Sequence, residues 1–165
     1  MLLKYRESLN TECRIAKPIL KMRAIKIDSN TDSLKNFVGC KDLKSCDYIK
    51  KRKKNLYFIE VSDFNAQLED LSKKSTDAIA KKYIKMEVKL KLSETILIFE
   101  QICKKFKINV TSIKNHKVLL SICKEKQSDV IVFDRLAREL TQHYCPTHFS
   151  SVQIIPYTKL ESIFL

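Results

Sequence analysis

This chain of 165 residues has no tryptophan and a single glycine, Gly39, so it offers few positions for tight turns that need a positive φ angle. Its three prolines, Pro18, Pro146 and Pro156, lie too far apart to mark a hinge, and the sequence contains neither an internal repeat nor a low-complexity linker. These absences predict long helices and strands joined by polar loops, organised as a single α/β domain over residues 1–165.

Long apolar runs are missing as well. No stretch reaches the roughly 18 apolar residues that a membrane-spanning helix needs, and the first seven residues carry charge too early for the core of a signal peptide. The six cysteines show no CxxC spacing, so they predict buried free thiols rather than a disulfide framework. We therefore expect a cytoplasmic protein that makes no contact with a membrane.

What the chain has in excess is positive charge. Lys and Arg number 32 against 19 Asp and Glu, which gives a formal net charge of +13 at pH 7. Such a field attracts phosphate backbones by counterion release, so nucleic acid, either DNA or RNA, is the expected partner. Only six of the 32 are Arg, which favours contact with backbone and shape over reading of guanine edges. The alternative is a solvated lysine-rich surface produced by compositional bias.

Hydrophobic periodicity predicts a small mixed β-sheet with a β-hairpin, flanked by helices. Outside the hairpin, strand patterns cover 19–27, 118–123 and 152–155, and helical patterns cover 2–9, 77–107 and 130–140. Within 77–107 one helix face is spelled out by Ile79, Tyr83, Met86 and Leu90. We expect Ser93 to cap a second helical segment inside this stretch.

The hairpin covers Cys46–Asp63, where two β-rich runs flank a polar tip. Residues two apart in a strand share a face, so Glu60 and Ser62 point to the same side. With an even-length turn, Asp47 falls opposite Phe58 or Glu60 and joins that face. Two carboxylates thereby converge on one edge of the sheet, and such hard oxygen ligands are what Mg²⁺ needs beside a phosphodiester.

This pattern resembles the restriction-endonuclease-like, or PD-(D/E)xK, superfamily: an Asp in one hairpin strand, about a dozen residues, Glu-x-Lys in the next strand, and then a long helix. The chain offers Asp47, twelve intervening residues, Glu60-Val61-Ser62 and the helical stretch. The resemblance implies a restriction-endonuclease-like core over roughly residues 19–123. It also implies that Asp47 and Glu60 are the catalytic, metal-binding acids and that Mg²⁺ is the cofactor.

The chain departs from the superfamily at Ser62, which stands where the catalytic lysine belongs. A serine cannot supply the positive charge that stabilises the pentavalent phosphate or the attacking hydroxide. Some members carry this lysine on the following helix, and here the candidates for that role and for phosphate contact are Lys81, Lys82 and Lys85.

A second group of basic residues occupies the tip of the hairpin: Lys50, Lys51, Arg52, Lys53 and Lys54. We expect this run to follow phosphates, because it belongs to the hairpin that carries the acids and is taken to lie beside them. The alternative is a solvated turn that prevents edge-to-edge aggregation. The compact cluster His143-Tyr-Cys145-Pro-Thr-His148 fits no common zinc module, and we interpret it as loop and cap residues.

The sequence thus predicts a nucleic-acid-binding protein with a restriction-endonuclease-like core, either a Mg²⁺-dependent nuclease or a catalytically degenerate relative. A homodimer is compatible with this prediction, because small nucleases that act on duplexes often dimerise. The alternative is a non-enzymatic protein-interaction module, such as an accessory protein of a mobile element. Charge reversal at Lys51–Lys54 should abolish nucleic-acid binding under the first hypothesis, whereas under the second it need not.

Overall fold

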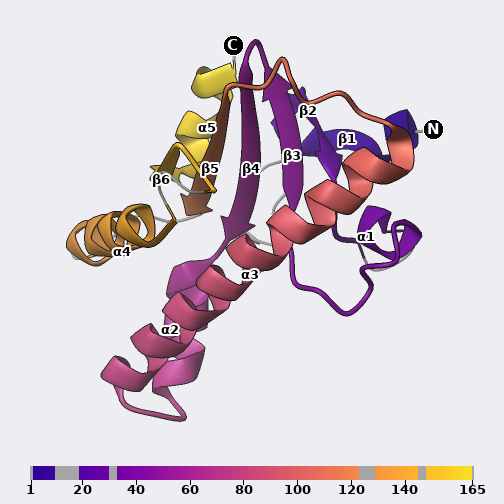
Figure 1. Ribbon diagram of the computed structural model, residues 1–165. Coiled ribbons are helices and arrows are strands. Elements are labelled where there is room, and N and C mark those ends of the chain that lie inside the picture. Colours follow the sequence, from indigo (N-terminus) through magenta and orange to yellow (C-terminus); the bar gives the residue numbers. More distant parts are fainter. Residues whose placement is uncertain (1, 10–18, 30–32, 123–128, 145–147, 165) are drawn as a thin grey trace.

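The protein is built on one six-stranded sheet. The structure, a computed structural model, describes residues 2–9, 19–29, 33–122, 129–144 and 148–164. The strands follow one another across the sheet in chain order (Figure 1): β1 Arg6–Leu9, β2 Ile19–Lys26, β3 Tyr48–Arg52, β4 Asn55–Ser62, β5 Asn115–Ile122 and β6 Ser151–Pro156. Strands β1 to β4 are antiparallel, whereas β4, β5 and β6 are parallel. The predicted mixed α/β architecture is confirmed.

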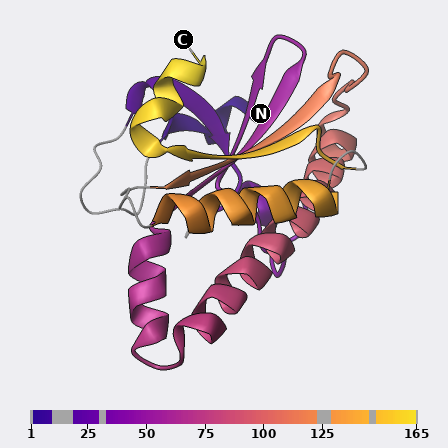
Figure 2. The ribbon, with the colours of Figure 1, turned by 90° about the vertical axis from the view of Figure 1, so that its left-hand side faces the viewer.

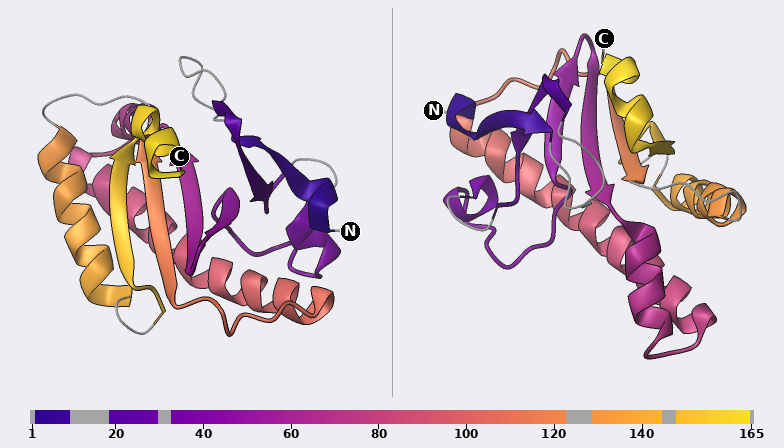
Figure 3. Two further views of the ribbon diagram at one scale, coloured as in Figure 1. Left: turned by 90° about the horizontal axis from the view of Figure 1, so that it is seen from above. Right: turned by 180° about the vertical axis from the view of Figure 1, so that it is seen from behind.

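Helices lie on both faces of the sheet (Figures 1 and 2). The helices of the described residues are the 3-10 helix η1 Leu2–Tyr5, α1 Leu34–Phe37, α2 Phe64–Ser72, α3 Asp77–Phe106, α4 Asp129–Tyr144 and α5 Tyr157–Phe164. The 30-residue helix α3 crosses one face, and α5 packs on the other. Helices α2 and α3 form a hairpin that projects beyond the sheet (Figures 1 and 3). No helix in the described ranges combines the length and the apolarity that a membrane crossing requires.

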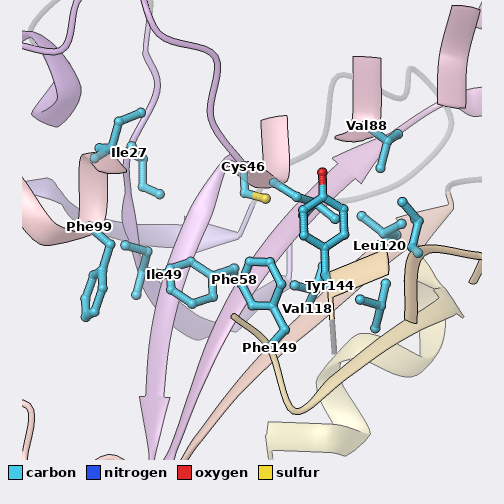
Figure 4. Close-up of a cluster of buried hydrophobic side chains, with 14 of the residues drawn as sticks. Ile27, Cys46, Ile49, Phe58, Val88, Phe99, Val118, Leu120, Tyr144 and Phe149 are labelled. Atoms are coloured by element: carbon cyan, nitrogen blue, oxygen red, sulfur yellow. The ribbon is translucent and has the colours of Figure 1, made fainter. Parts of the chain in front are cut away.

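Alternation along the strands divides the core into two layers. In β4, Phe58 faces α3 and packs edge-to-face on Phe99 and Phe149, with ring centroids 5.5 and 5.6 Å away. Its neighbours Tyr57 and Ile59 point to the opposite layer under α5. Figure 4 shows the α3 layer, in which apolar side chains of the sheet, α3 and α4 interlock. Strand β4, at the centre of the sheet, is therefore buried on both faces.

The chain passes from β4 to the parallel strand β5 through the α2–α3 hairpin. Asp63 directly follows β4, and its Oδ1 accepts a hydrogen bond from the Ala66 amide at 3.1 Å, so it caps α2. Glu60 lies level with Leu120 in the parallel register. The carboxyl ends of β4 and β5 therefore meet at one edge of the sheet, below α3.

Two sequence expectations about helices are corrected. Ser93 does not begin a second segment, because α3 is continuous and the Ser93 hydroxyl bonds to Tyr144 OH at 2.9 Å instead of capping an amide. Residues 2–9 are helical only over Leu2–Tyr5, because the following residues pair with β2. Helices α2 and α5 were not expected from the sequence.

The periodic face Ile79, Tyr83, Met86 and Leu90 is present on α3, but it points to solvent. Its side chains are 58%, 55%, 61% and 44% exposed. A second apolar stripe of the same helix packs on the sheet instead: Ala80, Ile84, Val88, Leu92, Thr95, Ile98, Phe99 and Ile102. Helix α3 therefore has two apolar sides, and only one of them is used within the described part of the chain.

Candidate active site

Asp47 and Glu60 come together where β3 begins and β4 ends. The turn between the strands has two residues, and Tyr48 pairs with Ile59, which brings the preceding residue, Asp47, level with Glu60. Oδ2 of Asp47 accepts a hydrogen bond from the Val61 amide at 2.7 Å. The hairpin thus has an even-length turn, which is the case in which the sequence placed Asp47 on the face of Glu60, and its register sets Asp47 opposite Glu60.

Glu60 is buried, with only 2% of the residue exposed. Its Oε1 accepts a hydrogen bond from Ser62 Oγ at 2.6 Å and binds Lys91 Nζ, also at 2.6 Å. Its other oxygen, Oε2, is buried without a hydrogen-bond partner in the described part of the chain. An unpartnered carboxylate oxygen in a buried site is costly, so Oε2 is the atom of this site most in need of a ligand.

Lys91 reaches Glu60 from helix α3. Burial of its ammonium works to lower the pKa, but the charge and hydrogen bond of Glu60, with Asp47 beyond it, outweigh burial and raise the pKa of Lys91 above its ordinary value. Lys91 therefore stays charged throughout the physiological range. It places a fixed positive charge beside the two acids.

Helix α3 also holds the segment that leads into Asp47. The Cys46 amide donates to Thr95 Oγ1 at 2.8 Å, and that hydroxyl donates to the carbonyl of Lys91 at 2.6 Å. One turn of α3 thus positions both Lys91 and the residue before Asp47. Burial, reinforced by the charge of Glu60, raises the pKa of the Cys46 thiol, so Cys46 acts here as a packed neutral side chain and not as a nucleophile.

The basic run at the hairpin tip is not beside the acids, contrary to the expectation from the sequence. Asn55, next to the turn, and Glu60 are five residues apart on β4, so the tip lies roughly 17 Å along the strand from the site. Lys50 donates to the carbonyl of Arg23 at 2.7 Å, and Arg52 donates to the carbonyl of Ile163. Lys50 therefore links β3 to the neighbouring strand β2, and Arg52 links β3 to α5.

The other three residues of the tip are exposed: Lys51, Lys53 and Lys54. They remain candidates for phosphate contact at the far end of the hairpin.

The three helix lysines considered for the catalytic role have other positions. Lys81 and Lys82 are exposed on the projecting part of α3, and Lys85 forms an ion pair with Glu139 of α4. Lys91, which the structure pairs with Glu60, was missed. A signal for it existed: it continues the spacing of the buried stripe between Val88 and Thr95, where a lysine needs a carboxylate partner.

Asp47 and Glu60 carry the kind of oxygen donor that Mg²⁺ takes. No three His, Cys, Asp or Glu side chains of the described ranges converge on one point, so the ion would rest on two carboxylates, Asp47 and Glu60. Mg²⁺ prefers this arrangement, since it keeps several waters and takes further oxygens from a substrate phosphate. Glu60 Oε2 is an oxygen of the required kind.

The remaining metal candidate, the cluster at 143–148, includes Cys145, which lies outside the described residues. His143 and His148 are both exposed.

Searches for similar proteins find no matching family model, no matching curated protein and no matching solved structure.

Proposed function

We propose that this protein binds nucleic acid and hydrolyses its phosphodiester bonds with Mg²⁺, using a restriction-endonuclease-like core. The observation that carries the proposal is the buried contact between Lys91 and Glu60 beside Asp47. These residues supply the two acids and the lysine of the PD-(D/E)xK pattern, with the lysine on the following helix in place of Ser62.

The sheet supports the proposal. An antiparallel series, β2, β3 and β4, carries the acids, and a long helix then leads into a strand parallel to β4. Ligands of such sheets bind at the carboxyl ends of the parallel strands, which is the edge where Glu60 lies. The net charge of +13 supports a polyanionic substrate.

Each residue has a distinct part in the proposed reaction. Asp47 and Glu60 would hold Mg²⁺, and the bound ion lowers the pKa of a water and offsets charge on the phosphate. The Lys91 ammonium faces the same place and stabilises negative charge that develops on the phosphate oxygens. Ser62 holds the Glu60 carboxylate in one orientation through its 2.6 Å hydrogen bond.

The test is fluorescence anisotropy with short duplex and single-stranded DNA and RNA at two salt concentrations, followed by gels of the same samples with Mg²⁺ or a chelator. We expect binding that weakens steeply with salt, and cleavage that requires Mg²⁺. Asp47→Asn, Glu60→Gln and Lys91→Met should each lower the cleavage rate by about a hundredfold or more while binding is kept.

Lys104→Met is the matched control, because this lysine lies exposed in the last turn of the same helix. It should leave cleavage unchanged. Binding without any cleavage in the wild type would mean that the chain is a degenerate relative. Absence of binding even at low salt would reject the proposal and favour the interaction module.

A further inference from the structure

Helix α3 shows a long apolar stripe on the side that points away from the sheet. Besides Ile79, Tyr83, Met86 and Leu90, it includes Leu97, which is 51% exposed. From Ile79 to Leu97 the stripe extends over 19 residues, or about 27 Å of helix. Isolated exposed apolar side chains are ordinary, but several that lie along one side of a helix mark a contact surface.

The middle of the stripe forms the floor of an open groove of about 520 Å³. One wall is Lys44, from the loop before β3, and the other is the end of α4 with His143 and Tyr144. Tyr144 is held in place, because its hydroxyl donates to the carbonyl of Lys89 at 2.7 Å. The surface along the stripe is therefore preformed.

The spacing of the stripe is that of a heptad repeat. Ile79 and Met86 occupy d positions, and a positions are held by Tyr83, Leu90 and Leu97, with Ser93 at the third d position. The residues that flank the stripe differ in charge from one side to the other. On the g side lie Lys82 and Lys89, and on the e side lie Glu87 and Glu94.

These charges complement a second copy of the same helix. In a parallel pair, the g side of one helix lies against the e side of its partner, five residues further along the chain. Lys82 would meet Glu87 of the partner, and Lys89 would meet Glu94. An antiparallel pair would set lysine against lysine and glutamate against glutamate. An acidic partner helix would leave the two glutamates facing like charge.

The two glutamates are already held at the edge of the stripe. Glu87 forms a 3.4 Å ion pair with Lys44 Nζ, and Glu94 accepts the Lys44 amide at 2.6 Å. Among the ion pairs of the described residues, none involves Lys82 or Lys89, so these lysines are available for a partner.

We propose that α3 pairs in parallel with α3 of a second copy of this chain, through the stripe and its charged flanks. The inference stands on exposure and charge alone and does not depend on the proposed catalysis. It assigns Lys82 to the contact between copies rather than to phosphate.

The first measurement is the mass of the full chain in solution by sedimentation equilibrium over a wide range of protein concentration. One copy has a mass of 19.3 kDa, and we expect twice that value. Met86→Glu with Leu90→Glu should give the single-copy mass. Both side chains are exposed, so the fold should survive, which circular dichroism would check. A single-copy mass for the wild type, or a doubled mass for this variant, would overturn the proposal.

Orientation is tested with two charge variants. Lys82→Glu with Lys89→Glu, and Glu87→Lys with Glu94→Lys, each place like charges on both flanks, so each should raise the dissociation constant about tenfold or more. Mixed together they should form a heterodimer, because every flank again meets its opposite. Lys53→Glu with Lys54→Glu, at the distant hairpin tip, is the charge control and should keep the doubled mass.

A lysine variant that dimerises as tightly as the wild type would overturn the parallel pairing, and so would a mixture that fails to pair. The lysine pair does not contact Lys44. The test therefore keeps its force even if exchange of the glutamates, which do contact Lys44, disturbs folding.

Discussion

The buried pair of Lys91 and Glu60 should be among the most strongly coupled interactions in the molecule. At 2.6 Å and an effective dielectric constant near 20, the attraction between the two charges is about 6 kcal/mol before the loss of water is counted. Removing one partner from such a buried pair costs about 3–5 kcal/mol, because the other charge is left without compensation.

The two single variants should lose different amounts of stability. Lys91→Met leaves the Glu60 carboxylate, with a 3% exposed side chain, in an apolar layer, so we expect a loss of about 4 kcal/mol in the free energy of unfolding. Glu60→Gln leaves Lys91, which is 23% exposed and can reach water, so the loss should be about 3 kcal/mol. The double variant should lose about 4 kcal/mol in the free energy of unfolding. This is about 3 kcal/mol less than the sum of the two single losses, and the difference is the coupling energy of the pair.

Urea unfolding followed by circular dichroism at pH 7 measures all four proteins. The surface pair Lys73 and Asp70 is the control, and its coupling should lie within error of zero. Losses for Lys91→Met and Glu60→Gln that simply add would refute the reasoning. The pH dependence has a definite sign: the pKa of Lys91 is raised in the folded state, so its contribution is complete below its ordinary value of 10.5 and is lost as pH rises above that value.

Three further predictions concern other parts of the molecule. Lys107 ends α3 in the left-handed region, with φ 52°, so Lys107→Gly should stabilise the fold by about 1 kcal/mol. Lys104 lies inside the helix, so Lys104→Gly should destabilise the fold by about the same amount. Urea unfolding measures both changes. Burial lowers the pKa of His116, so its contribution to stability is present above pH 6.5 and is lost as pH falls. His116→Gln should therefore flatten the stability profile between pH 7.5 and 5, and an unchanged profile would contradict this. Burial raises the pKa of the Cys46 thiol, so Cys46→Ser should leave the number of reactive thiols unchanged in folded protein and lower it by one in denaturant.

Much of the sheet could be predicted because its signals are local. The alternation in Cys46–Asp63 placed Asp47 and Glu60 on one face if the turn had an even length, but it left Phe58 and Glu60 open as the residue opposite Asp47. The register of the two-residue turn decides for Glu60. The position of the basic tip was wrong, because a hairpin long enough to carry the acids at one end necessarily holds its turn at the other. Helix α5 was missed because it follows Pro156 directly and is stabilised by packing under the sheet, through Tyr157 and Leu160.

Helix α3 shows why its buried face and Lys91 could not be predicted from the sequence. Its sequence contains two apolar stripes with the same period, and periodicity alone cannot tell which one faces the sheet. The stripe of Ile79 and Met86 is exposed, whereas the stripe of Ile84 and Val88 is buried. Because the stripe of Ile79 and Met86 was taken as the packed face of the helix, Lys91 was overlooked. A lysine is ordinary on a solvated face and indicates a site only on a buried one.

Because α3 is one uninterrupted helix, the number of residues in it determines where each of its side chains lies relative to the sheet. A single residue inserted between Ile84 and Lys91 would turn every later side chain by about 100° around the helix axis. Lys91 would then point away from Glu60, and the exposed stripe would be divided into two parts. An inserted heptad would restore the angle to within about 20° but move Lys91 by about 10 Å along the axis. We therefore expect homologous chains to gain or lose residues in their loops while the helix keeps its thirty residues.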